Sequence, residues 1–252
     1  MNTNLHNSKK IVICLPTYNE ATNIEYTITE ILKRLPYCQI FIIDDNSPDG
    51  TGSIADRLAK ATPNIRVIHR PEKQGLGVAY RHGFRVALCQ TDADLIIQMD
   101  ADMSHNPLHL WEMITTAESA DLVIGSRYVQ SGRTENWNVI RQGISAFGSF
   151  YAKRILSLPY NDLTSGFKVW SRDLLETILK HKITSNGYSF QIEMTYYAHL
   201  LNAHIIEIPI VFVDRNIGKS KMTLGNVFEA FWRVFLFRLQ KKTPNPLETR
   251  SF

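Results

Sequence analysis

The sequence predicts an α/β fold with a mainly parallel central sheet and helices on both of its faces. Short apolar runs of strand length alternate with longer segments of helical periodicity from residue 11 to residue 126. Strands joined by helices need crossover connections, which are right-handed and give parallel sheets covered on both faces. With 252 residues, 44% hydrophobic and 21% charged, the chain has the size and composition of one folded domain with its own core.

The elements follow one another in a regular order. Strands are predicted at residues 11–15, 39–43, 65–69, 95–99 and 122–126. Helices are predicted at residues 22–35, 78–88 and 107–118. Pro16 is expected to end the first strand because proline has no N–H to donate. Residues 205–213 read as one more strand, and Pro209 within it indicates a position near the edge of the sheet.

Charge and cysteine content exclude several classes of protein. Lys and Arg number 28 against 24 Asp and Glu, and this net charge of +4 is too small to indicate a nucleic-acid partner. Three cysteines with no Cys-x-x-Cys spacing argue against a disulfide framework or a structural zinc site: Cys14, Cys38 and Cys89. We find no secretory signal and no apolar stretch of about 18 residues, so we expect a cytoplasmic location and no membrane-spanning helix.

Acidic side chains follow several of the predicted strands. Ligands of parallel sheets bind at the carboxyl ends of the strands. The segments at those ends are 16–20, 44–51, 100–102 and 126–128, which contribute carboxylates and one arginine. We therefore expect a site on this edge of the sheet with the chemistry of a metal ion and phosphate groups.

Asp100 and Asp102 are the strongest candidates for metal ligands. Two carboxylates this close repel each other unless a cation lies beside them. Mg²⁺ is commonly held by one or two carboxylates together with the oxygens of a phosphorylated substrate. The alternative is that Asp102 and Ser104 cap the helix that begins near Pro107. The position directly after a buried strand favours the metal site.

Other polar or glycine-rich segments have simpler interpretations. Asp44 and Asp45 are also compatible with an Asx turn, and residues 49–51 with a turn that starts a helix. Residues 75–77 lack the lysine and third glycine of a phosphate loop, so we predict a tight turn that lets a helix pack closely. Four histidines share no ligand spacing and are expected to be structural or on the surface: His69, His82, His105 and His109.

Six basic residues are candidates for phosphate contacts: Arg127, Arg133, Arg141, Arg215, Lys219 and Lys221. We expect Arg133 and Lys219 to lie on solvated faces. Arg215 and Lys221 flank residues 216–220, a segment that follows a strand and could close over a ligand.

Eight sequence blocks occur in the order and at the spacing of a known family. They are residues 16–20 (PTYNE), 43–51 (IDDNSPDGT), 75–77 (GLG), 99–102 (MDAD), 125–128 (GSRY), 162–167 (DLTSGF), 187–194 (GYSFQIEM) and 213–221 (VDRNIGKSK). Together they resemble the dolichol-phosphate (polyprenol-monophosphate) mannosyltransferases, a branch of the family-two inverting glycosyltransferases. The resemblance covers about residues 10–222. Many sugar transferases share the first blocks, whereas the last two blocks are more specific to this branch.

The resemblance implies a GT-A nucleotide-sugar fold and transfer of mannose from GDP-mannose to a polyprenyl phosphate. It places five residues in the guanosine pocket: Pro16, Tyr18, Glu20, Ile43 and Asp45. Asp100, Ala101 and Asp102 would hold Mg²⁺ or Mn²⁺ with the donor's diphosphate and sugar. Ser104 stands where many members have a glutamine metal ligand, and Asn46 replaces a common glycine, a change that asparagine tolerates because it accepts φ > 0.

The resemblance also implies how the acceptor is used. Arg127, Arg141 and Ser145 match positions that receive the acceptor phosphate, while Arg215 and Lys221 would close on the donor's diphosphate. A phosphate is already an anionic nucleophile, so the mechanism needs no strong general base, and one displacement inverts the sugar linkage. Two alternatives remain: the same fold using another donor such as UDP-glucose, and a non-catalytic nucleotide-sugar-binding subunit.

A lipid acceptor requires contact with a membrane. We expect residues 1–222 to form the catalytic domain and residues 223–252 an amphipathic helix and tail. Residues 227–239 are predicted to dock onto a membrane surface, or onto a small membrane subunit, on the cytosolic side. Residues 140–158 fit a membrane-surface helix and a core helix equally well.

Overall fold

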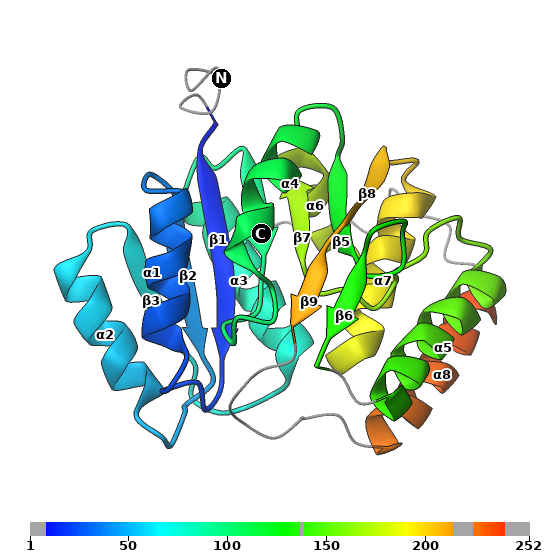
Figure 1. Cartoon of the computed structure of the whole chain (residues 1–252), viewed down its shortest axis with the longest axis horizontal. Coiled ribbons are helices and arrows are strands. Elements are labelled where there is room, and N and C mark those ends of the chain that lie inside the picture. The colour runs from blue at the N-terminus through cyan, green and yellow to red at the C-terminus, as the bar shows by residue number, and fades with distance from the viewer. Residues whose placement is uncertain (1–8, 137–138, 214–223, 240–252) are drawn as a thin grey trace.

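In the computed structural model of the chain, residues 9–136, 139–213 and 224–239 are described, and a seven-stranded sheet lies at the centre (Figure 1). Its strands, in spatial order, are β3 (Ile65–His69), β2 (Gln39–Asp44), β1 (Ile11–Thr17), β4 (Leu95–Gln98), β7 (Lys168–Ser171), β5 (Leu122–Ser126) and β8 (Ile205–Pro209). All pairs are parallel except those that β7 makes with its two neighbours. The predicted α/β class with a mainly parallel sheet is confirmed.

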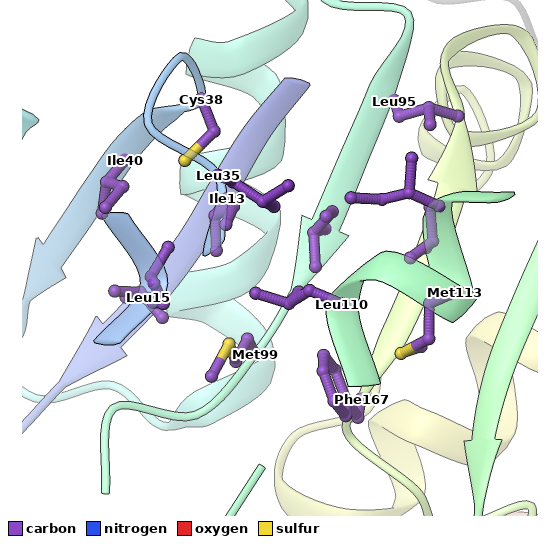
Figure 2. Packing of buried hydrophobic residues seen from close by; sticks show 14 of the residues in the cluster. Ile13, Leu15, Leu35, Cys38, Ile40, Leu95, Met99, Leu110, Met113 and Phe167 are labelled. Carbon is purple, nitrogen blue, oxygen red and sulfur yellow. The ribbon is translucent and has the colours of Figure 1, made fainter. Parts of the chain in front are cut away.

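Helices cover both faces of this sheet. They are α1 (Ile24–Arg34), α2 (Thr51–Ala61), α3 (Leu76–Gln90), the 3-10 turn η1 (Pro107–His109), α4 (Leu110–Thr116), α5 (Val139–Leu156), α6 (Arg172–Leu179), α7 (Gly187–Leu200) and α8 (Leu224–Leu239). Successive side chains of a strand point to opposite faces. Ile13 and Leu15 accordingly pack with α1 and α4 in one cluster (Figure 2), whereas Val12 and Cys14 pack with α3 and α6 in the other.

A third apolar cluster lies beneath α5, α7 and α8. Ala152 and Leu156 of α5 and Ile192 of α7 pack against Val234 and Phe237 of α8. Figure 1 shows α5 and α8 lying side by side at one end of the molecule. The predicted C-terminal helix is therefore partly a packed element. The proposed domain boundary at residues 222 and 223 lies outside the described residues.

The first strand continues through Pro16, and the prediction that Pro16 ends it is wrong. Pairing of β1 with β4 stops at Cys14 and Gln98, whereas pairing with β2 continues to Thr17. The Cys14 carbonyl accepts a bond on the β4 side and the Thr17 carbonyl accepts one from Asp45. Because strand residues alternate, Pro16 faces the side where pairing has ended, and its missing N–H costs no ladder bond there.

The segment 205–213 forms two strands rather than one. β8 is the last strand of the large sheet, which confirms the edge position that Pro209 indicated. β9 (Val211–Val213) leaves that sheet and pairs with β6 (Arg133–Glu135) in a separate two-stranded sheet. The predicted helix 107–118 likewise begins as the 3-10 turn η1 before α4.

β7 is one of several elements that the sequence did not reveal, together with β6, α6 and α7. It runs antiparallel between β4 and β5, with Lys168 opposite Gln98 and Trp170 opposite Ile96. At its far end, Arg172 donates hydrogen bonds to the carbonyls of Leu88, Thr91 and Ala93 and so satisfies acceptors at the end of α3. Its reversed direction places the residues that precede Lys168 at the carboxyl edge of the parallel strands.

Candidate active site

At one end of this edge, Asp44 serves the turn that follows β2. Its carboxylate accepts hydrogen bonds from the hydroxyls of Thr17 at 3.0 Å and Ser47 at 2.6 Å. Asn46 has φ 55°, and its Nδ2 donates to the Pro71 carbonyl at 3.1 Å. Asp44 Oδ2 also accepts the backbone N–H of Ser47 at 3.1 Å, so Asp44 stabilises the turn, although the bond spans three residues and not the two of an Asx turn. Asparagine at position 46 does adopt the left-handed backbone that we expected.

Asp45 is instead held by a buried arginine. It forms an ion pair with Arg70, and both side chains are almost fully buried. Arg70 Nη2 also donates to Gln74 Oε1 at 2.8 Å. Burial raises the pKa of Asp45 even though the charge and hydrogen bond of Arg70 oppose that rise. Arg70 was not predicted, although it directly follows the third strand and the strand-end rule applied there would have found it.

The other residues predicted for the guanosine pocket lie around Asp45. Pro16 and Ile43 are neighbours in the β1–β2 pairing. The Ile43 side chain is buried against α3, and the residue as a whole is fully buried. Tyr18 lies on the surface of this region with Lys73 Nζ 3.9 Å from the centre of its ring.

Glu20 is buried at the entry to α1. Its backbone N–H donates to Thr51 Oγ1 at 2.9 Å, and its carboxylate accepts from Asn23 Nδ2 at 2.9 Å. Asp49 accepts from the backbone N–H and the hydroxyl of Thr51, the first residue of α2, which confirms the predicted turn and helix start. A Cβ atom at Gly77 would lie 2.7 Å from the Ser185 carbonyl oxygen, which confirms the predicted close packing of the helix after residues 75–77.

Asp100 follows β4 and is fixed on two sides. Its Oδ1 accepts a hydrogen bond from the Tyr80 hydroxyl at 3.0 Å, and its backbone N–H donates to His105 Nδ1 at 2.9 Å. Burial is the largest cause that raises the pKa of Tyr80, and the charge of Asp100 adds to it. Tyr80 therefore stays protonated and acts as a donor to this carboxylate.

His105 stabilises the loop after β4 by accepting a hydrogen bond from the backbone N–H of Asp100. Because its Nδ1 accepts from Asp100, its proton is on Nε2, and burial lowers its pKa, which keeps the ring neutral. The ring stacks on Phe167 at 5.0 Å and meets Phe212 edge-on at 5.5 Å. Its structural role agrees with the prediction.

Asp102 and Ser104 form the other part of the acidic turn. Asp102 Oδ1 accepts from the Ser104 N–H at 3.1 Å and from its hydroxyl at 2.6 Å. The Ala101 carbonyl accepts from Thr27 Oγ1 of α1 at 2.9 Å. The side chain of Asp100 is 32% exposed and Asp102 is only 5% exposed, so the two carboxylates reach solvent to different extents.

This set of donors fits a hard divalent cation. Asp100 and Asp102 supply carboxylate oxygens, and Ser104 places a hydroxyl oxygen beside them. Within the described ranges, no group of three or more His, Cys, Asp or Glu side chains is arranged to hold a metal ion. A cation at this place would take its remaining ligands from substrate and water, as Mg²⁺ commonly does.

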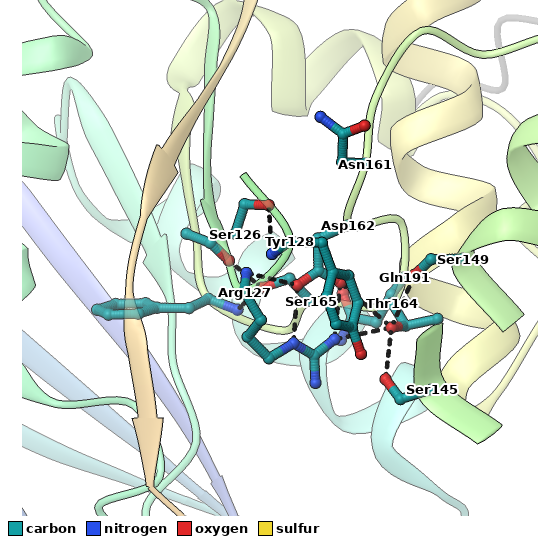
Figure 3. Close-up of polar contacts among 12 residues, drawn as sticks. Ser126, Arg127, Tyr128, Ser145, Ser149, Asn161, Asp162, Thr164, Ser165 and Gln191 are labelled. Carbon is teal, nitrogen blue, oxygen red and sulfur yellow. Dashed lines mark hydrogen bonds and ion pairs between the residues drawn. The ribbon is translucent and has the colours of Figure 1, made fainter. Parts of the chain in front are cut away.

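Arg127 and Asp162 form a buried ion pair at the far side of the site (Figure 3). Asp162 accepts from Arg127 through the backbone N–H at 2.9 Å and through Nε and Nη2 at 2.7 Å each. Burial alone would raise the pKa of Asp162, but the charge and hydrogen bonds of Arg127 outweigh it and lower the pKa overall. Arg127 was predicted from the sequence as a phosphate contact. Asp162 was part of the block 162–167, and no role was predicted for it.

Thr164 joins this ion pair to α5. Its hydroxyl lies 2.8 Å from Arg127 Nη2, 3.3 Å from Ser145 Oγ and 3.2 Å from Ser149 Oγ, as Figure 3 shows. The structure therefore brings together Arg127 and Ser145, two of the three residues predicted for the acceptor phosphate. Arg141 lies in α5 one helical turn before Ser145, and its side chain is outside the described residues.

Of the other basic candidates, one lies within the described residues and three lie outside them. Arg133 is exposed and pairs with Glu135 at 2.9 Å, as expected for a solvated residue. Arg215, Lys219 and Lys221 lie outside the described residues, in the segment that follows β9.

A comparison with protein families agrees with this geometry: the family described as "Glycosyl transferase family 2" matches residues 12–179. The chain belongs to glycosyl transferase family 2.

Close relatives of this glycosyltransferase confirm the resemblance to the polyprenol-phosphate mannosyltransferases. The undecaprenyl-phosphate mannosyltransferase of Micrococcus luteus is 41% identical over 225 residues, which are 89% of this chain and 92% of the relative. The polyprenol monophosphomannose synthase of Mycolicibacterium smegmatis is 38% identical over 229 residues, which are 90% of this chain and 86% of the relative.

Two solved structures with similar folds are those of sugar transferases. Glucosyl-3-phosphoglycerate synthase from Mycobacterium tuberculosis, solved with Mn²⁺ and UDP, gives a TM-score of 0.63 at 18% identity over 93% of this glycosyltransferase and 80% of that chain. The mannosyltransferase PcManGT from Pyrobaculum calidifontis, solved with GDP-Man and Mn²⁺, gives 0.57 at 16% identity over 91% and 70% of the two chains. The predicted GT-A fold is thereby confirmed. Every helix in the described ranges is too short or too polar to cross a bilayer.

Proposed function

We propose that this glycosyltransferase transfers mannose from GDP-mannose to a polyprenyl phosphate, with inversion, and releases GDP and a β-mannosyl phosphoryl polyprenol. The observation that carries the proposal is the pairing of an acidic turn, Asp100 to Asp102, with the Arg127–Asp162 cluster on one edge of the sheet. The names of both close relatives support a mannosyl donor and a polyprenyl phosphate acceptor.

The nucleoside would bind at the β1–β2 end of the edge. Asp45, held by Arg70, offers a carboxylate that can accept hydrogen bonds from a guanine ring. Tyr18 and Pro16 border the same region. GDP-mannose as the donor is also compatible with the GDP-Man complex of the structural neighbour from Pyrobaculum calidifontis.

Asp100, Asp102 and Ser104 would hold Mg²⁺ or Mn²⁺. A divalent cation bound there would supply positive charge to the donor's diphosphate. Tyr80 and His105 keep the acidic turn in place, because one donates to the Asp100 carboxylate and the other accepts from its backbone. Arg215 and Lys221, in the segment after β9, are proposed to contact the same diphosphate as it leaves.

The acceptor phosphate would bind beside Arg127, Arg141 and Ser145. Arg127 is already oriented by Asp162 and Thr164, so little side-chain entropy remains to be lost when the phosphate binds. Orientation of the phosphate oxygen in line with the anomeric carbon is then the main task of these residues. Because the phosphate oxygen is the nucleophile, no side chain has to remove a proton, and a single displacement inverts the configuration.

The test is transfer of labelled sugar to an organic-extractable lipid by the full chain, with polyprenyl phosphate and Mg²⁺. Label from GDP-mannose, lost with EDTA, is the expected result. Label only from UDP-glucose would refute the mannosyl donor and keep the lipid acceptor. Asp102→Ala is expected to abolish transfer with an unchanged circular-dichroism spectrum, and retained turnover would contradict the metal assignment.

The lipid acceptor implies a membrane-facing surface, which we place on α5 and α8. Five large apolar side chains are exposed there: Phe147 (56%), Phe150 (59%), Trp232 (62%), Phe235 (40%) and Leu239 (61%). Helix positions 232, 235 and 239 share one face, so α8 packs on the protein with one side and presents apolar groups on another. Neither a pure core helix nor a purely solvated helix fits this pattern, and insertion into the headgroup region does.

Vesicles containing polyprenyl phosphate and anionic phospholipid test this surface. Replacement of Trp232 and Phe235 by glutamine should release the enzyme from sedimenting vesicles and leave transfer to a short, water-soluble polyprenyl phosphate intact. Replacement of Tyr26 and Tyr37, which are 58% and 80% exposed, by glutamine is the matched control. Unchanged sedimentation of the Trp232 and Phe235 variant would refute the assignment.

A further inference from the structure

A cluster of polar side chains is buried between β4, β7 and α7, and the mechanism above makes no use of it. Its members are Gln98, Lys168, Trp170, Gln191 and Thr195, all almost completely buried. A buried polar group is costly unless its hydrogen bonds are made, so the bonds within this cluster show which way each group points.

Lys168 fixes one end of the Gln191 side chain. Its Nζ donates to the Gln191 carbonyl oxygen at 2.9 Å, to Gln191 Oε1 at 3.2 Å and to Thr195 Oγ1 at 2.9 Å. When Lys168 is protonated it has no lone pair to offer, so the Gln191 atom that faces the ammonium group must be the amide oxygen. Burial lowers the pKa of Lys168 to about 7, and Asp162 opposes that shift.

Trp170 fixes the same orientation by an independent route. Its indole Nε1 can only donate, and it donates to Gln98 Oε1 at 3.3 Å. The Nε2 of Gln98 must then face the other way, and it donates to Gln191 Oε1 at 2.6 Å. The indole N–H, which can only donate, and the protonated Lys168 therefore agree that Oε1 of Gln191 points into the buried cluster.

The Nε2 amide of Gln191 consequently points out of the cluster, toward the site. A Cβ atom placed on Gly166 would lie 3.4 Å from Gln191 Nε2, 3.2 Å from His105 Cε1 and 3.8 Å from Asp100 Oδ2. Gly166 thus leaves a small space lined by an amide donor and by one of the two carboxylates of the acidic turn. To the described residues, Gln191 Nε2 makes no hydrogen bond, although only 2% of the Gln191 surface is exposed.

We propose that Gln191 is a donor-binding residue, whose Nε2 hydrogen-bonds an oxygen of the sugar-phosphate part of the nucleotide sugar bound beside Asp100. The oxygen belongs either to a sugar hydroxyl or to a phosphate, since both accept from an amide. Lys168 and the Gln98–Trp170 pair are positioning groups that hold the amide with its N–H groups toward the site. This inference rests on the proposed function, because it needs a nucleotide sugar as the ligand.

The experiment measures the dissociation constants of GDP-mannose and GDP by calorimetry, with Mn²⁺, for the full chain and three variants. Gln191→Glu keeps an oxygen for Lys168 and Gln98 and removes the donor, so we expect an unchanged or higher Tm and roughly 10- to 100-fold weaker binding of GDP-mannose. Gln191→Met removes both the acceptor oxygen and the amide donor and adds no charge, so we expect a lower Tm with a similar loss of affinity. Thr195→Val, which disturbs the far side of the cluster, should lower the Tm and leave the dissociation constant within twofold.

Each outcome decides the point. Weakening of GDP-mannose alone assigns the contact to the sugar, and weakening of both ligands assigns it to a phosphate. Binding within twofold of wild type in both Gln191 variants overturns the proposal, as does weakening in Gln191→Glu alone, which would be a charge effect. If the wild type binds UDP-glucose instead of GDP-mannose, the mannosyl donor of the proposed function is overturned. Weaker UDP-glucose binding in both Gln191 variants then supports this inference, whereas binding within twofold overturns it. Failure to bind either one overturns the proposed function and this inference together.

Discussion

Replacement of Asp162 by asparagine should destabilise the protein strongly, because it leaves the buried Arg127 guanidinium without its counter-charge. The carboxylate of Asp162 accepts three hydrogen bonds from Arg127, at 2.7 to 2.9 Å. Removal of one partner of a buried ion pair costs about 3–5 kcal/mol. For a chain of this size 1 kcal/mol corresponds to about 2–4 °C, so we expect the Tm to fall by about 6–20 °C.

The same pair makes a contribution to stability that depends on pH. Arg127 and the hydrogen bonds lower the folded pKa of Asp162 below its unfolded value, which is about 3.9. The stabilisation is therefore fully present above the unfolded pKa and is lost as the pH falls through the folded pKa. Asp162→Asn should remove this part of the acid-induced loss of stability.

The assay combines chemical denaturation with kinetics in a double-mutant cycle of Asp162→Leu and Arg127→Met. The double variant should recover much of the stability that either single variant loses, because a buried pair can be replaced by apolar groups at little cost. If Arg127 receives the acceptor phosphate, Asp162→Asn should also raise the KM for the polyprenyl phosphate more than the KM for GDP-mannose. A coupling free energy below about 0.5 kcal/mol would refute the reasoning.

Two further predictions concern packing and the buried lysine. Gly77→Ala should destabilise the protein by about 1–3 kcal/mol in urea denaturation, because the new Cβ would lie 2.7 Å from a backbone oxygen. Gly143→Ala, where a Cβ meets nothing within 4 Å, is the control and should stabilise helix α5 by up to about 1 kcal/mol; equal effects of the two substitutions would contradict the packing argument. The unfolded chain binds a proton at Lys168 up to a pKa of about 10.4, while the folded chain releases it at about 7. Stability should therefore rise with pH between these values, and Lys168→Met should flatten that slope.

The fold could be predicted where hydrophobic pattern alone determines structure. Strands β1, β2, β4 and β5 are apolar runs buried on both faces, and the more exposed β3 is still mainly apolar, so each was located within a few residues. β7 could not be found in this way, because it is short and carries Lys168 in place of an apolar residue. Its polar side chain is tolerated only because Gln191 and Thr195, distant in sequence, accept its hydrogen bonds.

Some residues of the site could also be predicted from the sequence, and others could not. Asp100, Asp102 and Arg127 could be located from the sequence, since each lies within four residues of the end of a strand and carries a charge suited to metal or phosphate. Their partners could not, since Arg70 and Asp162 gain their significance from a charge opposite them in space. The orientation of the Gln191 amide depends on the bonds of two other side chains and has no signature in the sequence.

The register of β7 in the sheet also determines where Gly166 lies relative to the site. Alternation of side chains means that the strand could slip only by two residues without turning its buried face outward, a displacement of about 7 Å. Such a slip would carry Gly166 away from Asp100, and it would also take Lys168 away from Gln191 and Thr195, which accept its hydrogen bonds. Arg172 and Trp170 oppose it from the far end of the strand. A weakened anchor at that end would therefore reduce the fraction of active molecules in an active-site titration, and the misregistered molecules would have a lower Tm because the buried Lys168 would lose its partners.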